Sequence, residues 1–147
     1  MKQTLKVAVA TLALASFATI AHAASEGDAD KGKKIFNKCK VCHMVGEKAK
    51  NRVGPPLNDI IDAKAGAQEG YMKKYSPAMK AAGKDGLMWS VEKLDEYLMK
   101  PKKLIPKTKM AFPGLKKDKD RANVIAYLKT FSKMEKKDGM EKMEKKQ

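Results

Sequence analysis

Two cysteines and a histidine stand within one pentapeptide, Cys39-Lys40-Val41-Cys42-His43. Two thiols at this spacing can bond to the two vinyl groups on one edge of a haem, and the adjacent histidine can then ligate the iron. A redox-active dithiol, half of a zinc site and a small structural disulfide are the competing interpretations. A redox dithiol needs no histidine at this position, and a structural zinc ion needs four ligands. The pentapeptide therefore favours covalent haem attachment, with His43 as an iron ligand.

The first 23 residues have the pattern of a signal peptide. A short basic start is followed by an apolar run over residues 7–20 and by the small-residue cleavage pattern Ala21-His22-Ala23. The apolar run is too short for a permanent membrane span, so an uncleaved anchor is the less favoured alternative. We expect residues 1–23 to be removed and the mature protein to be soluble in the periplasm.

Cleavage before Ala24 removes one of the two histidines, His22. His43 is then the only histidine of the mature chain, and Cys39 and Cys42 are its only cysteines. A second histidine therefore cannot complete the coordination of an iron ion. Cysteine and histidine alone also cannot form a zinc site within one such chain.

Positive charge dominates the composition. The formal net charge of the full chain is +15, and +13 remains once Lys2 and Lys6 leave with the signal peptide. So basic a protein attracts acidic partners, and nucleic acid is the usual first candidate. Export from the cytoplasm argues against nucleic acid and leaves acidic protein surfaces or anionic lipid headgroups.

Helix signals are separated by long irregular segments. Capping residues and apolar periodicity predict helices over residues 28–39, over 90–100, and from 118 or 120 to 131. Ser76 can cap a further short helix, and the apolar patch of residues 57–61 predicts a single helical turn. Glycine and proline predict loops over most of 44–88 and over 101–117. Loops of this length need another organiser, and a buried haem would also enlarge a small apolar core.

The sixth position of the iron is open to methionine, lysine, solvent or an external ligand. Ten methionines are present, and most methionines fill protein cores. Met110 stands at the centre of a loop whose backbone is restricted by Pro106, Pro113 and Gly114. It follows His43 by 67 positions (110 − 43), enough chain to pass round a haem and return on its opposite face. We therefore predict Met110 as the sixth ligand, which would raise the reduction potential.

Nine motifs follow one another in an order and spacing that resemble those of class I cytochromes c, the soluble bacterial carriers related to mitochondrial cytochrome c. They are Asp30-Lys-Gly-Lys-Lys-Ile-Phe36, Cys39–His43, Val53-Gly-Pro-Pro-Leu57, Tyr75-Ser-Pro-Ala-Met-Lys80, Gly86-Leu-Met-Trp89, Leu94-Asp-Glu-Tyr-Leu98, Pro101-Lys-Lys-Leu-Ile-Pro106, Thr108-Lys-Met-Ala-Phe112 and Ala126-Tyr-Leu-Lys129. The resemblance covers residues 27–132. It implies an all-α, small cytochrome c-like domain over 24–132, with crossing N- and C-terminal helices and long loops wrapped around one covalent haem c.

The resemblance also implies which residues bind the haem iron and its vinyl groups. Cys39 and Cys42 would form the two thioether bonds, and His43 and Met110 would be the axial ligands. The carbonyl of Pro55 would accept a hydrogen bond from the other ring N–H of His43, which fixes the tautomer of the imidazole.

Polar side chains would complete the surroundings of the haem. The resemblance implies that Tyr75 and Trp89 hydrogen-bond a haem propionate. It also implies that Tyr97 and Thr108 line the side of the haem that faces Met110.

The chain departs from the family pattern at three places. Asp62-Ala63 stands where the family often has Gly-Arg, whose arginine helps to neutralise a propionate. The segment Tyr71-Met-Lys-Lys74 is longer than the common pattern, and Lys107 replaces a frequent glycine. None of these residues is an implied iron ligand.

These features predict a monomeric one-electron carrier that is not an enzyme. A haem peroxidase or gas-binding haem protein needs an open iron face and usually a distal base or arginine. The mature chain has no second histidine and only two arginines, Arg52 and Arg121. A thiol–disulfide oxidoreductase would need a thioredoxin-like βαβ pattern around the cysteines, and the sequence shows none.

By resemblance, seven basic residues would surround the exposed haem edge. They would steer acidic docking surfaces on membrane redox complexes: a quinol-oxidising cytochrome complex, a terminal oxidase or a photosynthetic reaction centre. The seven residues are Lys38, Arg52, Lys102, Lys103, Lys109, Lys116 and Lys117.

Residues 133–147 form a basic tail rich in methionine, lysine and glutamate. We predict a solvated, partly helical or disordered segment. A tether to acidic partners and a copper(I) site built from Met134, Met140 and Met143 are less favoured alternatives.

Overall fold

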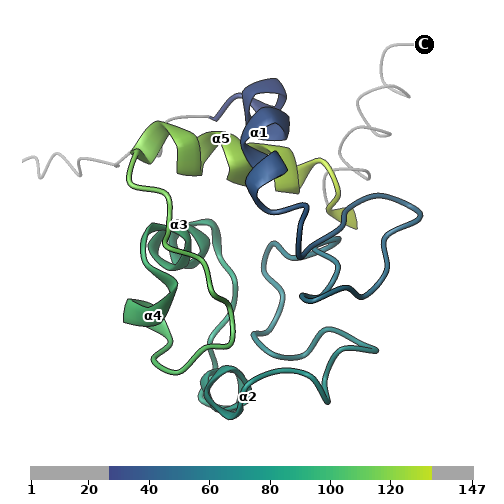
Figure 1. Cartoon of the computed structure of the whole chain (residues 1–147), viewed down its shortest axis with the longest axis vertical. Helices are drawn as coiled ribbons and strands as arrows, with labels where there is room; N and C mark the ends of the chain where they lie inside the picture. Colours follow the sequence, from purple (N-terminus) through teal and green to yellow (C-terminus); the bar gives the residue numbers. More distant parts are fainter. Residues whose placement is uncertain (1–26, 134–147) are drawn as a thin grey trace, which may run out of the picture.

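Two helices from opposite ends of the domain cross each other in the computed structural model, which describes residues 27–133 (Figure 1). The elements are α1 (Ala29–Ile35), the short 3-10 helix η1 (Phe36–Lys38), α2 (Pro77–Lys84), α3 (Val91–Met99), α4 (Pro101–Leu104) and α5 (Asp118–Lys129). These residues contain no strand, only an isolated bridge between Lys64 and Met88. The predicted all-α class is confirmed. The predicted signal peptide and residues 134–147 of the predicted tail lie outside the described residues.

The crossing of α1 and α5 depends on a glycine. A Cβ atom added at Gly32 would lie 2.0 Å from the carbonyl oxygen of Asn123, so a larger residue would force the two helices apart. Beside this contact, the rings of Phe36 and Tyr127 pack with their centroids 5.4 Å apart. Phe36 is only 1% exposed, as is Val124 on α5. The predicted helix pair therefore forms one end of the hydrophobic core.

The predicted N-caps form as side chain to backbone hydrogen bonds, which satisfy amide groups in the first helical turn. The pairs are Asp28 with the N–H of Lys31 (3.0 Å), Ser76 with that of Met79 (3.1 Å) and Ser90 with that of Lys93 (3.3 Å). The first helix is predicted to continue to about residue 39, and it does so as α1 followed by the tighter η1.

Two local predictions are wrong. The sequence pattern predicts a loop after Pro101, but Pro101 begins the four-residue helix α4. Proline ends the preceding helix and is nevertheless tolerated in the first turn of a new one. The single turn predicted over residues 57–61 is not helical, because Asp59 adopts a left-handed φ of +54°.

Arg121 joins α3, α5 and the end of the loop between them. Its side chain is 5% exposed and donates to Asp95 (2.8 Å), to Asp118 (2.7 Å) and to the carbonyl of Leu115 (2.9 Å). The hydrogen bond to Asp95 is the main reason that the pKa of Arg121 is raised, and Asp118 adds to the rise. This buried guanidinium fixes the C-terminal end of the loop that carries Met110.

Within the same described residues, no helix is both long enough and apolar enough to span a membrane.

Candidate functional site

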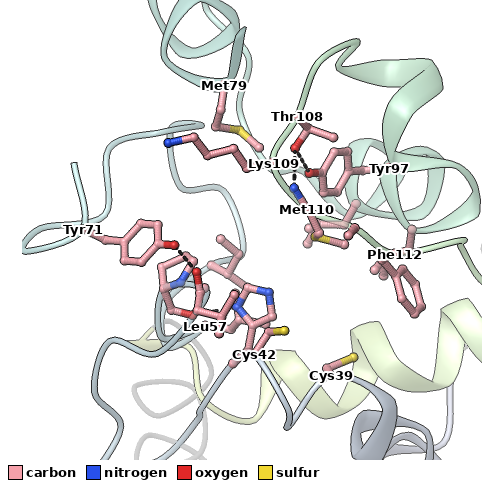
Figure 2. A pocket seen from close by; sticks show the side chains of 18 of the residues that line it. Cys39, Cys42, Leu57, Tyr71, Met79, Tyr97, Thr108, Lys109, Met110 and Phe112 are labelled. Atoms are coloured by element: carbon pink, nitrogen blue, oxygen red, sulfur yellow. Dashed lines mark hydrogen bonds between the residues drawn. The ribbon is translucent and has the colours of Figure 1, made fainter. Parts of the chain in front are cut away.

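An apolar cavity of about 420 Å³ separates the Cys39–His43 pentapeptide from the loop that carries Met110 (Figure 2). Cofactor sites are commonly of this size and are lined mainly by apolar groups with a few polar ones. The wall includes side chains from η1, α2, α3 and α5 and from the long loops between them. The loops without regular structure therefore converge on one space.

The pentapeptide is a tight turn that continues η1. The backbone N–H groups of Cys42 and His43 both donate to the carbonyl of Cys39, at 3.0 and 2.8 Å. Both cysteines are half-buried free thiols on the cavity wall. Burial raises the pKa of Cys39 to about 11, and the neighbouring Cys42 adds to the rise. A redox-active dithiol needs a thiol that ionises readily, so this environment argues against that interpretation.

His43 lies on the cavity wall and uses one of its two ring nitrogens in a hydrogen bond. Nδ1 donates to the carbonyl of Pro55 at 2.7 Å, which places the proton on Nδ1 and leaves the Nε2 lone pair free to bind a metal. Burial lowers the pKa of His43 despite the opposing effect of the Pro55 carbonyl, so the imidazole is neutral near pH 7. A Cβ added at Gly54 would lie 2.3 Å from the imidazole Cε1.

The donor set of this wall fits a haem and not a zinc ion. A neutral imidazole nitrogen and two thiols lie next to an apolar cavity large enough for a cofactor. Within residues 27–133, no group of three or more His, Cys, Asp or Glu residues is placed to hold a metal ion.

Met110 is half-buried on the cavity wall, in a loop anchored to α3. Its backbone N–H donates to the Thr108 hydroxyl at 3.3 Å, and that hydroxyl shares a buried hydrogen bond of 3.0 Å with Tyr97. Further along, Gly114 has a φ of +98° and lies against α3, where an added Cβ would meet the carbonyl oxygen of Met99 at 2.1 Å. Lys107 adopts a φ of +63°, a left-handed conformation that glycine adopts without strain.

Met79 is a second methionine on the cavity wall, and the sequence analysis does not single it out. It belongs to α2 and is 7% exposed. In Figure 2 its thioether lies at the end of the cavity far from Cys39 and Cys42, whereas Met110 lies between the two ends. Helical periodicity cannot distinguish a methionine that faces a cofactor from one that faces ordinary core.

Tyr75 and Trp89 also line the cavity. The Trp89 ring packs against Tyr97 with centroids 4.8 Å apart and is almost fully buried. Burial raises the pKa of Tyr75 to about 12, so its phenol keeps its proton at neutral pH. Tyr75 and Trp89 each bring a hydrogen-bond donor, an O–H and an indole N–H, to the wall of the cavity.

Tyr71, in the segment that is longer than the family pattern, is a cavity residue that the sequence analysis missed. It is 7% exposed, its hydroxyl donates to the carbonyl of Val53, and its ring packs edge-on against Tyr75 at 4.9 Å. The Lys74 ammonium lies 5.8 Å from the centre of the Tyr71 ring. An aromatic residue in an irregular segment gives no sign of burial, because the segment has no helical or strand period.

The seven predicted docking residues are all exposed but are not equally close to the cavity. Lys38 and Lys109 line it, and the Arg52 guanidinium donates to the carbonyl of Lys40 in the pentapeptide at 2.9 Å. The other four lie on α4 and immediately before α5, away from the cavity wall: Lys102, Lys103, Lys116 and Lys117. Their role in docking stays a prediction.

Residues 29–132 match the family model described as Cytochrome c. The chain belongs to the cytochrome c family. A cytochrome c2 of Afifella marina is 52% identical over 100 residues, which are 68% of this chain and 79% of the relative. A cytochrome c-550 of Nitrobacter winogradskyi is 48% identical over 107 residues, covering 73% of this chain and 94% of the relative.

Solved structures agree with this family assignment. The structure of cytochrome c2 from Rhodospirillum centenum superposes with a TM-score of 0.68 at 41% identity, covering 72% of this chain and 99% of the other. Cytochrome cH from Methylobacterium extorquens superposes with a TM-score of 0.63 at 46% identity, covering 71% and 99%. The predicted cytochrome c-like fold is confirmed.

Membership explains the cavity, because cytochromes of this family carry one covalent haem c attached through a cysteine pair such as Cys39 and Cys42. The protein is a cytochrome c2-like electron carrier and not an enzyme. The prediction of a carrier, made from the sequence, is confirmed at this level.

Proposed function

We propose that this cytochrome carries single electrons on a haem attached through Cys39 and Cys42, with its iron between His43 and Met110. The observation that carries the proposal is that all four side chains line one apolar cavity. Haem supplies the one-electron couple, and a methionine opposite histidine raises its reduction potential. The protein's part is to hold both ligands still and to exclude water from the iron.

The two axial ligands are supported by neighbouring hydrogen bonds. The Pro55 carbonyl orients the His43 ring and strengthens it as an electron donor. On the opposite wall, Tyr97 and Thr108 hold the backbone of Met110. A ligand that stays in place in both oxidation states keeps the reorganisation small when the electron moves.

Met110 is the better candidate for the sixth ligand than Met79. The iron occupies the centre of the porphyrin, so its ligand must reach the middle of the cavity. Met110 lies there in Figure 2, whereas Met79 lies by α2 at the end far from the cysteines.

Residues 24–132 would form the mature domain, after removal of the signal peptide at residues 1–23, with 133–147 as a solvated basic tail. The protein would then act in the periplasm as a monomer. The two relatives described above, which cover most of this domain, are bacterial cytochromes, which supports that location.

The partners would be membrane redox complexes with acidic docking surfaces, because the mature chain has a net charge of +13 once two lysines are removed from +15. The rate of electron transfer to such a complex should fall several-fold between low and high ionic strength. Stopped-flow measurements would test this, and a rate independent of salt would rule out electrostatic docking.

Absorption spectra of the purified oxidised and reduced protein test the proposed site. We expect the reduced spectrum of a haem with two thioether bonds and, in the oxidised protein, the far-red band of methionine-ligated ferric haem. A high-spin spectrum, or an oxidised spectrum without that band, would contradict the proposed ligation.

A further inference from the structure

The end of the cavity opposite the cysteines has to accommodate charge, provided that haem binds as proposed above. In a haem, the two vinyl groups and the two propionate carboxylates lie on opposite edges of the porphyrin. Attachment of the vinyl edge to Cys39 and Cys42 therefore directs the carboxylates to the far end, toward α2. A carboxylate taken out of water is costly unless it is paired or hydrogen-bonded.

The charged side chains on the cavity wall are all positive among the described residues. They are Lys38, Lys74 and Lys109, with no aspartate or glutamate among them. Lys38 precedes Cys39 and so belongs to the vinyl edge. Figure 2 shows the amino group of Lys109 to one side of Met79, at the end of the cavity far from both cysteines.

Lys74 and Lys109 lie together. The Lys109 ammonium donates to the backbone carbonyl of Lys74 at 3.1 Å, which links the loop of Met110 to the Tyr71–Lys74 segment. The Lys74 ammonium in turn lies 5.8 Å from the ring centre of Tyr71, a distance at which a cation is attracted to an aromatic face. Tyr71 is itself held by its bond to Val53.

The two cations adjoin a phenol that has a proton to donate. Tyr75 directly follows Lys74, packs against Tyr71 and lines the same cavity. No arginine lines the cavity among residues 27–133, and neither Asp62 nor Ala63 supplies a cation. The long Tyr71–Lys74 segment therefore brings a positive charge to the end of the cavity where the haem carboxylates belong.

We propose that Lys74, supported by Lys109, neutralises the haem carboxylates and so sets the balance between ferrous and ferric haem. A carboxylate near the iron favours the ferric state, and a cation beside that carboxylate offsets this effect. Lys74 acts through the carboxylates and does not contact the iron. Its position on the cavity wall makes it a residue that tunes the reduction potential of the haem.

Lys74→Gln, compared with Lys73→Gln, tests this proposal. Both substitutions remove one positive charge from adjacent, exposed positions, but Lys74 lines the cavity and Lys73 does not. At equilibrium with a fixed reference couple, the ratio of ferric to ferrous haem should be about threefold or more higher in Lys74→Gln than in Lys73→Gln. Redox-difference infrared spectra should show displaced haem carboxylate bands only in Lys74→Gln, and Lys74→Arg should restore both signals.

A second pair, Lys109→Gln against Lys107→Gln, should give a shift in the same direction. Equal redox equilibria in Lys74→Gln and Lys73→Gln, or unmoved carboxylate bands, would overturn the proposal and leave Lys74 as a surface charge. That result, obtained with normal haem attachment and a normal far-red band, would leave the proposed function intact. Failure of the unsubstituted protein to show that band would instead remove the proposed ligation.

Discussion

The two walls of the haem cavity are held in different ways. On the histidine wall, five consecutive residues form one turn, and a single carbonyl twelve positions away, that of Pro55, orients the ring. On the methionine wall, Met110 depends on Thr108 and Tyr97 at one end of its loop and on Gly114 at the other. One wall is local in sequence, whereas the other is assembled from α3, α5 and the loop between them.

Because of this difference, a substitution can weaken the bond between Met110 and the iron without affecting attachment of the haem. Thioether bonds at Cys39 and Cys42 would survive loosening of the surrounding structure because they are covalent. The Met110–iron bond would not, since it lasts only while α3 and α5 hold the loop in place. Substitutions remote from the iron should therefore affect the methionine side and leave the haem attached.

The largest loss of stability is expected for Arg121→Ala. The buried guanidinium binds Asp95, Asp118 and the Leu115 carbonyl, and losing these charge-assisted hydrogen bonds costs about 3 kcal/mol in the free energy of unfolding, because the two carboxylates are partly exposed and become solvated. Asp118 is 91% exposed, so Asp118→Asn should cost less than about 1 kcal/mol. Chemical denaturation measures both. A loss below 1 kcal/mol in Arg121→Ala would show that this network does not hold the methionine wall.

A smaller loss of stability is expected when alanine replaces either of two glycines that have nearly the same backbone conformation. Gly114 and Gly86 have φ angles of +98° and +93°, but an added Cβ meets the Met99 carbonyl at 2.1 Å in the first case and nothing within 4 Å in the second. Gly86→Ala should lower the free energy of unfolding, measured by chemical denaturation, by about 1 kcal/mol, because alanine is strained at this φ. Gly114→Ala should lower it by about 2 kcal/mol or more and should also weaken the far-red band. Equal costs would mean that the contact with α3 does not matter.

The same contrast explains how far sequence could predict the site. The pentapeptide is contiguous, and the caps at Asp28, Ser76 and Ser90 act within three residues, so local pattern suffices for them. Arg121 stands on the apolar face of α5, three residues before Val124, but its charge argues against burial until Asp95 and Asp118 are seen to pair with it. Tyr71 lies in an irregular segment with no helical or strand period. The left-handed Asp59 and the helix begun by Pro101 likewise depend on tertiary packing that overrides local propensity.

The central claim is that the methionine wall supplies its ligand through Met110, and a pair of alanine substitutions tests it most directly. Met110→Ala and Met79→Ala each remove one thioether from the cavity wall. The proposal predicts that both proteins keep covalent haem, that Met110→Ala loses the far-red band of the oxidised protein and has a lower reduction potential, and that Met79→Ala keeps the band. Survival of the band in Met110→Ala, or its loss in Met79→Ala alone, would contradict the account.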